Sequence, residues 1–309
     1  MNNTIVELSR NEIKANDSLQ GMYSQWISYI DVTEQTRKTY EKALKQFFLY
    51  LGNNGISNPT RQDILDYKAH LLETRKATTT QMYIIALRQF FDFCEINGLY
   101  ENIAKNIKGA KVQKGFKKDY LTKAQIKDLL ANTNTDTTEG ARDYAILCLM
   151  LTTGIRTIEV VRAKTEDIKP LGNDIVLYLQ GKGRQDKTEC VKVAPVVLEA
   201  IKKYRTMLEA DSEYLFVSLS NKNKGGQLTT RSISRIVSKY LQLANLKSDR
   251  LTAHSMRHTA ITQMLLNGAT LEEARQVARH SNINTTLIYN HAIERANNNS
   301  EIALAEAIL

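Results

Sequence analysis

The chain has 309 residues, of which 42% are apolar and 24% charged, as in folded globular domains and unlike disordered or fibrous chains. This length predicts two domains. No apolar stretch approaches the roughly 20 residues that cross a bilayer, and the three cysteines are widely spaced without a disulfide or metal-ligand pattern, so we expect a cytoplasmic protein with no membrane contact.

The first third of the chain predicts a bundle of helices. Apolar residues recur at three- and four-residue spacing in 34–51 and again in 78–97. We expect four helices within residues 18–104, the first beginning near Ser18. Residues 1–17 are then an N-terminal extension.

Residues 105–118 form a strongly basic connector. They hold six lysines and no acidic residue, in a chain whose net charge is +9. Gly109 and Gly115 oppose a stable helix here. One interpretation is a solvated linker between domains. The other is a clamp on a polyanion such as nucleic acid, because bound phosphates offset the repulsion among lysines and release counterions.

Residues 119–299 predict a mixed α/β domain that is mainly helical. Residues 141–151 are apolar nearly all round, as in a buried central helix. Two strand-like runs, 174–180 and 189–195, are joined by a glycine-containing turn that favours a hairpin. A third strand is expected at 213–219, which gives a small antiparallel sheet.

Two pairs of polar residues could carry chemistry. His254 and Arg257 are three residues apart, so a helix places them on one face, where they could bind one anion. Arg156 follows the apolar helix, and a guanidinium against a core requires an anion or an acid. Glu159 could orient it. The alternatives are a polar helix start for the first pair and a buried structural ion pair for the second.

Three further residues are weak signals when each is taken alone. Lys182 lies in the glycine-flanked turn, where lysines are usually solvated. His280 and Tyr289 lie nine residues apart in a helical stretch, and a tyrosine among Ile, Leu and Thr is usually a core aromatic.

Together and in order, these residues resemble the signature of the tyrosine recombinase family, also called phage-type integrases. The resemblance is carried by the segments TTGIRTIEVV, QGKGR and LTAHSMRHTAITQMLLNGATLEEARQVARHSNINTTLIYNH. The chain departs from the common pattern in three places: Arg279 replaces a glycine before the histidine, Ile158 replaces a small polar residue, and the stretch after Lys182 is longer and lacks the usual proline, with Lys192 in the second strand.

The resemblance implies a fold class and a domain plan. The fold would combine an all-α helical-bundle core-binding domain with a mixed α/β catalytic domain. Residues 18–104 would be the SAM-like, DNA-binding bundle, 105–118 the basic interdomain linker and 119–299 the catalytic domain. Residues 300–309 would be a tail that docks on a neighbouring protomer. We expect the simpler Xer-like architecture, without an added arm-binding domain.

The resemblance also implies a reaction. Tyr289 would attack a DNA phosphodiester and form a 3′-phosphotyrosyl link, with His254 helping to take its proton. Arg156 and Arg257 would hold the non-bridging oxygens, and His280 would donate a further hydrogen bond to them. Lys182 would protonate the departing 5′-oxygen, and Glu159 would orient its arginine. Because one ester is exchanged for another, no metal, ATP or other cofactor is expected.

The implied partners are double-stranded DNA recombination sites, two of which a homotetramer would hold during integration or excision of a mobile element or plasmid. Accessory DNA-bending or directionality factors stay open. The candidate DNA contacts are Lys105, Lys108, Lys111, Lys114, Arg37, Lys38, Thr79, Thr80, Thr230, Arg231 and Arg235. Two alternatives remain: a type IB topoisomerase-like enzyme that cuts without pairing two sites, and a non-catalytic DNA-binding regulator.

Overall fold

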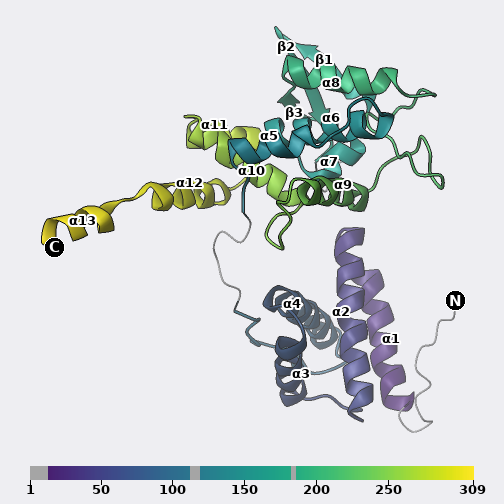
Figure 1. The fold of residues 1–309 in the computed structure, drawn as a ribbon. Helices are drawn as coiled ribbons and strands as arrows, with labels where there is room; N and C mark the ends of the chain where they lie inside the picture. The colour runs from purple at the N-terminus through teal and green to yellow at the C-terminus, as the bar shows by residue number, and fades with distance from the viewer. Residues whose placement is uncertain (1–12, 112–118, 182–185) are drawn as a thin grey trace. The chain divides into compact units, whose positions relative to one another are not determined.

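The chain forms two compact units, Met1–Lys114 and Gly115–Leu309. The computed structural model describes residues 13–111, 119–181 and 186–309. The first unit is all helical, and the second combines helices with a three-stranded antiparallel sheet (Figure 1). The predicted fold class is thereby confirmed.

The first unit is a bundle of four helices around an aromatic core. The helices are α1 (Ile13–Tyr29), α2 (Glu34–Asn53), α3 (Arg61–Thr74) and α4 (Ala77–Ile96). Trp26 and Phe90 are fully buried, with ring centroids 5.6 Å apart. The first helix begins at Ile13, earlier than the expected Ser18. Asn16, Asp17 and Ser18 are of residue types that favour helix starts, but they are not confined to such positions and here lie inside the helix.

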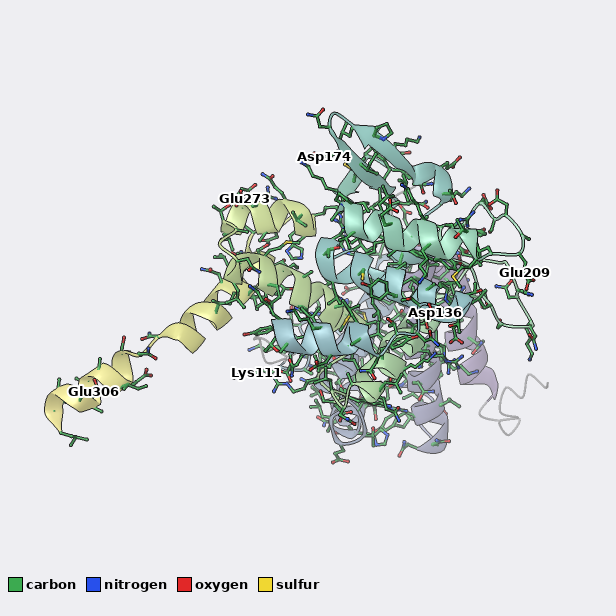
Figure 2. All side chains as sticks on the ribbon, turned by 45° about the horizontal axis from the view of Figure 1, so that its top comes forward. Lys111, Asp136, Asp174, Glu209, Glu273 and Glu306 are labelled. Carbon is green, nitrogen blue, oxygen red and sulfur yellow. The ribbon has the colours of Figure 1, made fainter. Side chains whose placement is uncertain are left out.

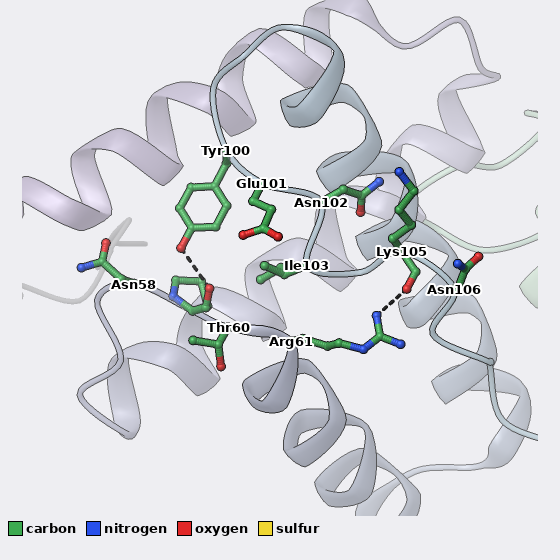
Figure 3. Close-up of a pocket in the computed structure, with 10 residues that line it drawn as sticks. Asn58, Thr60, Arg61, Tyr100, Glu101, Asn102, Ile103, Lys105 and Asn106 are labelled. Carbon is green, nitrogen blue, oxygen red and sulfur yellow. Dashed lines mark hydrogen bonds between the residues drawn. The ribbon is translucent and has the colours of Figure 1, made fainter.

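The chain beyond α4 packs onto this bundle. Ile103, Ala104 and Ile107 are buried in its core, while Lys105 and Lys108 are exposed. Arg61 donates a hydrogen bond to the Lys105 carbonyl beside a hollow at the start of α3 (Figure 3), and the Lys68 ammonium donates to the Lys108 carbonyl at 2.7 Å. The first residues of the basic connector are therefore held against the helical unit.

The second unit carries the sheet and nine α-helices within its described residues. Its elements in chain order are α5 (Lys123–Ala131), α6 (Thr138–Thr153), α7 (Thr157–Arg162), the 3₁₀ turn η1 (Thr165–Asp167), β1 (Ile168–Leu171), β2 (Asp174–Leu179), β3 (Glu189–Lys192), α8 (Pro195–Thr206), α9 (Thr230–Leu243), α10 (Ala253–Leu266), α11 (Leu271–Ala278), α12 (Asn284–Asn297) and α13 (Ser300–Ile308).

The sheet has the order β1-β2-β3, with both neighbouring pairs antiparallel. The predicted hairpin of β2 and β3 is present, with Leu177 opposite Val191. The expected third strand at 213–219 is wrong: this segment makes only isolated bridges, among them Val217 with Gln227. The third strand is β1, which contains a proline and lies at the sheet edge, where a missing N–H is tolerated.

Helix α6 is the buried centre of the second unit, as its apolar sequence predicts. It packs against α8 and α10. It ends at Gly154, whose φ of +62° is the left-handed conformation that glycine adopts without a steric penalty. Among the described residues, no helix has the length and apolar character needed to cross a membrane.

Candidate active site

Four of the predicted catalytic residues lie where helices of the second unit begin or meet. Arg156 directly precedes α7, Arg257 lies on α10, His280 follows α11 and Tyr289 lies on α12. Helix α10 contacts α6, α11 and α12, and α11 contacts α12 (Figure 1). The fold therefore brings together residues that span more than a hundred positions of the sequence.

Arg257 is a buried guanidinium held by backbone carbonyls. It is 3% exposed, and it donates to the carbonyl of Gly154 at 2.6 Å and to that of Ala278. These carbonyls close the C-terminal ends of α6 and α11, whose dipoles favour a cation. Burial, together with the nearby charge of Arg156, lowers the pKa of Arg257 to about 10, so it stays charged at neutral pH.

Arg156 is held by an acid, as its sequence context predicts. Glu159 is fully buried and accepts from the Arg156 guanidinium at 2.8 Å and from the Arg156 backbone N–H at 2.7 Å. The side chain of Arg156 is 31% exposed, so part of this side chain is accessible to an anion, and its second terminal nitrogen donates to the Arg279 carbonyl at 3.5 Å. Arg279 also donates to Glu159, at 2.7 Å. We call Arg156, Arg257 and Arg279 the guanidinium cluster.

His280 is a buried imidazole next to this cluster. Its Nδ1 lies 2.9 Å from the hydroxyl of Thr286, which is also buried. Burial and the charges of Arg257 and Arg156 lower the pKa of His280 to about 4. The ring is therefore neutral at physiological pH, and only one of its nitrogens carries a proton.

Tyr289 is buried against the same residues. It is 4% exposed, with its ring centroid 6.3 Å from that of His280. Burial raises its pKa to about 12, although the charge of Arg257 opposes this shift. The phenol is accordingly protonated at neutral pH and would need a base to become a nucleophile.

His258 is a neighbour of Tyr289 that the sequence analysis missed. The centroid of the His258 ring lies 4.7 Å from that of the His254 ring and 5.1 Å from that of the Tyr289 ring. His254 itself is exposed at the start of α10. The spacing of His254 and His258 by four residues was a usable signal, because it places both rings on one face of the helix.

The other predicted residues divide into three groups. Lys182 and Lys114 lie outside the described residues. The expectation for Thr80 is corrected, because its side chain is fully buried within the first unit and cannot reach a base. The remaining candidate DNA contacts, which are half-buried or exposed, are Lys105, Lys108, Lys111, Arg37, Lys38, Thr79, Thr230, Arg231 and Arg235.

Two lysines of this last set pair with acidic residues of the first unit, which weakens the prediction that they contact DNA. Lys38 pairs with Glu34 at 2.5 Å and Lys105 with Glu95 at 3.3 Å. Thr230, Arg231 and Arg235 all lie exposed along α9.

This geometry can bind an anion and present a phenol to it. Fixed guanidiniums bind phosphate oxygens through parallel hydrogen bonds, and a neutral imidazole can donate one more. The tyrosine beside them could attack a phosphorus atom.

Comparison with known families gives matches over most of the chain. The model of the phage integrase family matches residues 119–295, and that of the phage integrase N-terminal SAM-like domain matches residues 24–97. A tyrosine recombinase of Thermosipho africanus is 26% identical, covering 90% of this chain and 96% of that relative. The tyrosine recombinase XerA of Pyrococcus furiosus is 29% identical, covering 88% and 93%.

Solved structures share the fold. The XerH recombinase bound to its palindromic difH substrate has a TM-score of 0.71 at 20% identity, covering 96% of this chain and 90% of that one. The Tn1549 transposon integrase in complex with circular intermediate DNA has a TM-score of 0.68 at 18% identity, covering 88% and 94%.

Proposed function

The chain belongs to the phage integrase family and is a tyrosine site-specific recombinase, and from this premise we propose that it cuts DNA through Tyr289. The observation that carries the proposal is that Tyr289, His280 and the guanidinium cluster lie together.

The proposed step is a transesterification. The Tyr289 oxygen attacks phosphorus, a 3′-phosphotyrosyl bond forms, and the 5′-oxygen leaves and takes up a proton. Because burial raises the pKa of Tyr289, attack requires a base. We propose His254 for this role, with the His258 ring between the rings of His254 and Tyr289. We propose Lys182 as the donor of the proton to the 5′-oxygen.

The guanidiniums stabilise the charge that develops at phosphorus. Arg156 and Arg257 bind the non-bridging oxygens, while Glu159 fixes the orientation of Arg156. His280 adds a hydrogen bond from Nε2 if the Thr286 hydroxyl donates to Nδ1. Removing one such contact typically slows a reaction about a hundredfold. The reaction conserves the number of ester bonds, so it needs no ATP, and the guanidiniums supply the positive charge that a metal ion would otherwise provide.

We further propose that the substrates are two double-stranded DNA sites and that four protomers assemble on them. The support is a tail with unused apolar surface: Ile302, Leu304 and Ile308 on α13 are at least 59% exposed, and no residue of this helix is buried (Figure 2, around Glu306). In the assembly, α13 docks on a neighbouring protomer. We propose integration or excision of a mobile element or plasmid as the role.

A covalent-adduct experiment tests the reaction. Wild-type protein is incubated with fragmented genomic DNA of its source cell in EDTA, and adducts that resist SDS are sequenced to map the cut site. A duplex with this site and a nick beside it, which lets the free 5′-end diffuse away, should then accumulate adduct.

The matched control is Tyr289→Phe, which keeps the ring and removes the attacking oxygen. We expect no adduct from this variant on the nicked duplex, together with unchanged DNA binding. Adduct formation by Tyr289→Phe would show that another residue is the nucleophile. A two-site assay then separates recombination from cutting and rejoining at a single site.

A further inference from the structure

Arg279 places a third guanidinium beside the two that the proposed reaction uses. Its backbone φ is +54°, a left-handed conformation that is costly for a residue with a Cβ. The side chain is nevertheless inside the protein, 5% exposed, and it pairs with Glu159 at 2.7 Å. Its Nε lies 3.6 Å from a carboxylate oxygen of Glu189 on β3.

The contacts of Glu159 show what Arg279 can do. One carboxylate oxygen faces the Arg156 guanidinium, and the other accepts from both the Arg156 backbone N–H and Arg279. One negative charge is thus shared between two guanidiniums. Without Arg279, the charge of Glu159 would be offset by Arg156 alone, and the pair would attract a phosphate less strongly.

We propose that Arg279 is a positioning residue that shares the charge of Glu159 and thereby keeps Arg156 available to the DNA phosphate. Its contact with Glu189 holds the guanidinium in place from the side of the sheet. The inference rests on the proposed function, since it assumes that Arg156 binds the phosphate that Tyr289 attacks.

Direct binding of DNA by Arg279 is the competing interpretation, and burial argues against it. Arg156 has 31% of its side chain exposed, whereas Arg279 has 5%. Two nitrogens of Arg279 are also engaged, by Glu159 and by the Val277 carbonyl at 2.8 Å. An anion that binds the cluster therefore reaches Arg156 before Arg279.

The test is a double-mutant cycle on the nicked duplex. Arg279→Gly suits the left-handed backbone, so it removes the guanidinium without adding strain. We expect about tenfold slower adduct formation, or about 1.4 kcal/mol, with unchanged DNA affinity. In the Glu159→Gln background, Arg279→Gly should have little further effect, because the charge through which it acts is gone.

Other variants keep the test decisive. Arg279→Lys retains a cation and should recover part of the lost rate, which a merely structural defect would not predict. Urea unfolding confirms that each variant is folded. An unchanged rate of adduct formation in Arg279→Gly would overturn the proposed role of Arg279. So would an equal loss of rate in the wild-type and Glu159→Gln backgrounds. Neither result would overturn the proposed function. If wild-type protein forms no adduct, the proposed function is overturned and this role with it.

Discussion

At the scale of single residues, the candidate site depends on buried side chains whose pKa values are shifted from those in water. Arg257 remains charged because its pKa is lowered only to about 10, and backbone carbonyls accept its hydrogen bonds; the carboxylate of Glu159 pairs with Arg156. His280 and Tyr289 remain neutral because burial disfavours their ions. In the proposed reaction, the same cluster would provide fixed cations for a phosphate and a protonated phenol that needs a base.

The pKa of His280 makes the stability of the protein depend on pH. The folded protein binds a proton at His280 only near pH 4, whereas the unfolded chain binds one near pH 6.5. The unfolded state is therefore favoured by protons between these values, and the free energy of unfolding should fall as the pH drops from about 6.5 to about 4. The loss from this residue is on the order of 3 kcal/mol.

Urea unfolding at pH 7 and pH 4.5 measures this effect. Carboxylates also titrate in this range, so the comparison is with His280→Gln, which keeps an amide near Thr286 but does not titrate. We expect the variant to lose less stability between the two pH values than the wild type does. Equal losses in both proteins would contradict a depressed His280 pKa.

At the scale of helices and strands, the catalytic residues depend on how α6 ends. Gly154 has a φ of +62°, and its carbonyl accepts from Arg257 at 2.6 Å. A Cβ at this position would lie 3.5 Å from that of Ala260, an ordinary contact. Backbone strain, not crowding, is therefore what favours glycine here.

Gly154→Ala should cost about 1–2 kcal/mol of stability, the typical penalty for a left-handed residue with a Cβ. It should also slow adduct formation, because the carbonyl that holds Arg257 shifts with the backbone. The urea midpoint and the single-turnover rate measure the two effects. Gly172→Ala is the matched control: it has a φ of +59° in the turn between β1 and β2, so it should lose similar stability and no rate.

The helices could be predicted from the sequence more completely than the sheet. The signals that predict a helix lie within that helix itself. They are the spacing of its apolar residues and its capping side chains, such as Thr122 on α5 and Thr270 on α11. A strand instead needs a partner elsewhere in the chain. The apolar run at 213–219 has only single bridging residues opposite it, whereas the short, proline-containing β1 pairs fully with β2.

The candidate site was predictable as a set of residue types and not as a set of contacts. The pairing of Arg156 with Glu159 follows from a three-residue spacing. The position of His258 beside Tyr289 depends on how α10 and α12 pack, and the pairing of Arg279 with Glu159 depends on how the end of α11 meets α7. Those contacts join segments that are remote in the sequence, so only the folded chain reveals them.

At the scale of the whole molecule, DNA affinity should depend on salt through the basic residues. The slope of log K against log salt is negative, and each lost phosphate contact makes it shallower by about 0.9. If Arg231 and Arg235 on α9 both contact phosphates, replacing both by glutamine should make the slope shallower by about 1.8. Filter-binding titrations over a range of salt concentrations measure it.

The matched control is Lys202→Gln on α8, a residue that pairs with Glu199 at 2.9 Å. It removes one cation outside the proposed DNA-binding helix, and the slope should not change. If the α9 double variant has the wild-type slope, α9 does not contact phosphates.

Deleting residues 300–309 should separate binding from assembly. The shortened protein should bind a single site and form adduct at the wild-type rate, because α13 contributes no buried residue to its own unit. It should fail to pair two sites in a gel-shift or light-scattering assay. Full-length protein with Ile302, Leu304 and Ile308 changed to serine should behave in the same way, and normal pairing by either protein would contradict the docking of α13.

The contacts of Arg257 have a practical consequence for anyone who needs an inactive reference protein. Because one guanidinium closes the ends of both α6 and α11, a change at this position disturbs folding and chemistry at once, and its lost activity cannot be interpreted. Tyr289→Phe removes a single oxygen from an otherwise intact ring. If Tyr289 is the nucleophile, as we propose, this variant is the better choice wherever an inactive but folded recombinase is required, for example to capture uncut complexes for crystallisation.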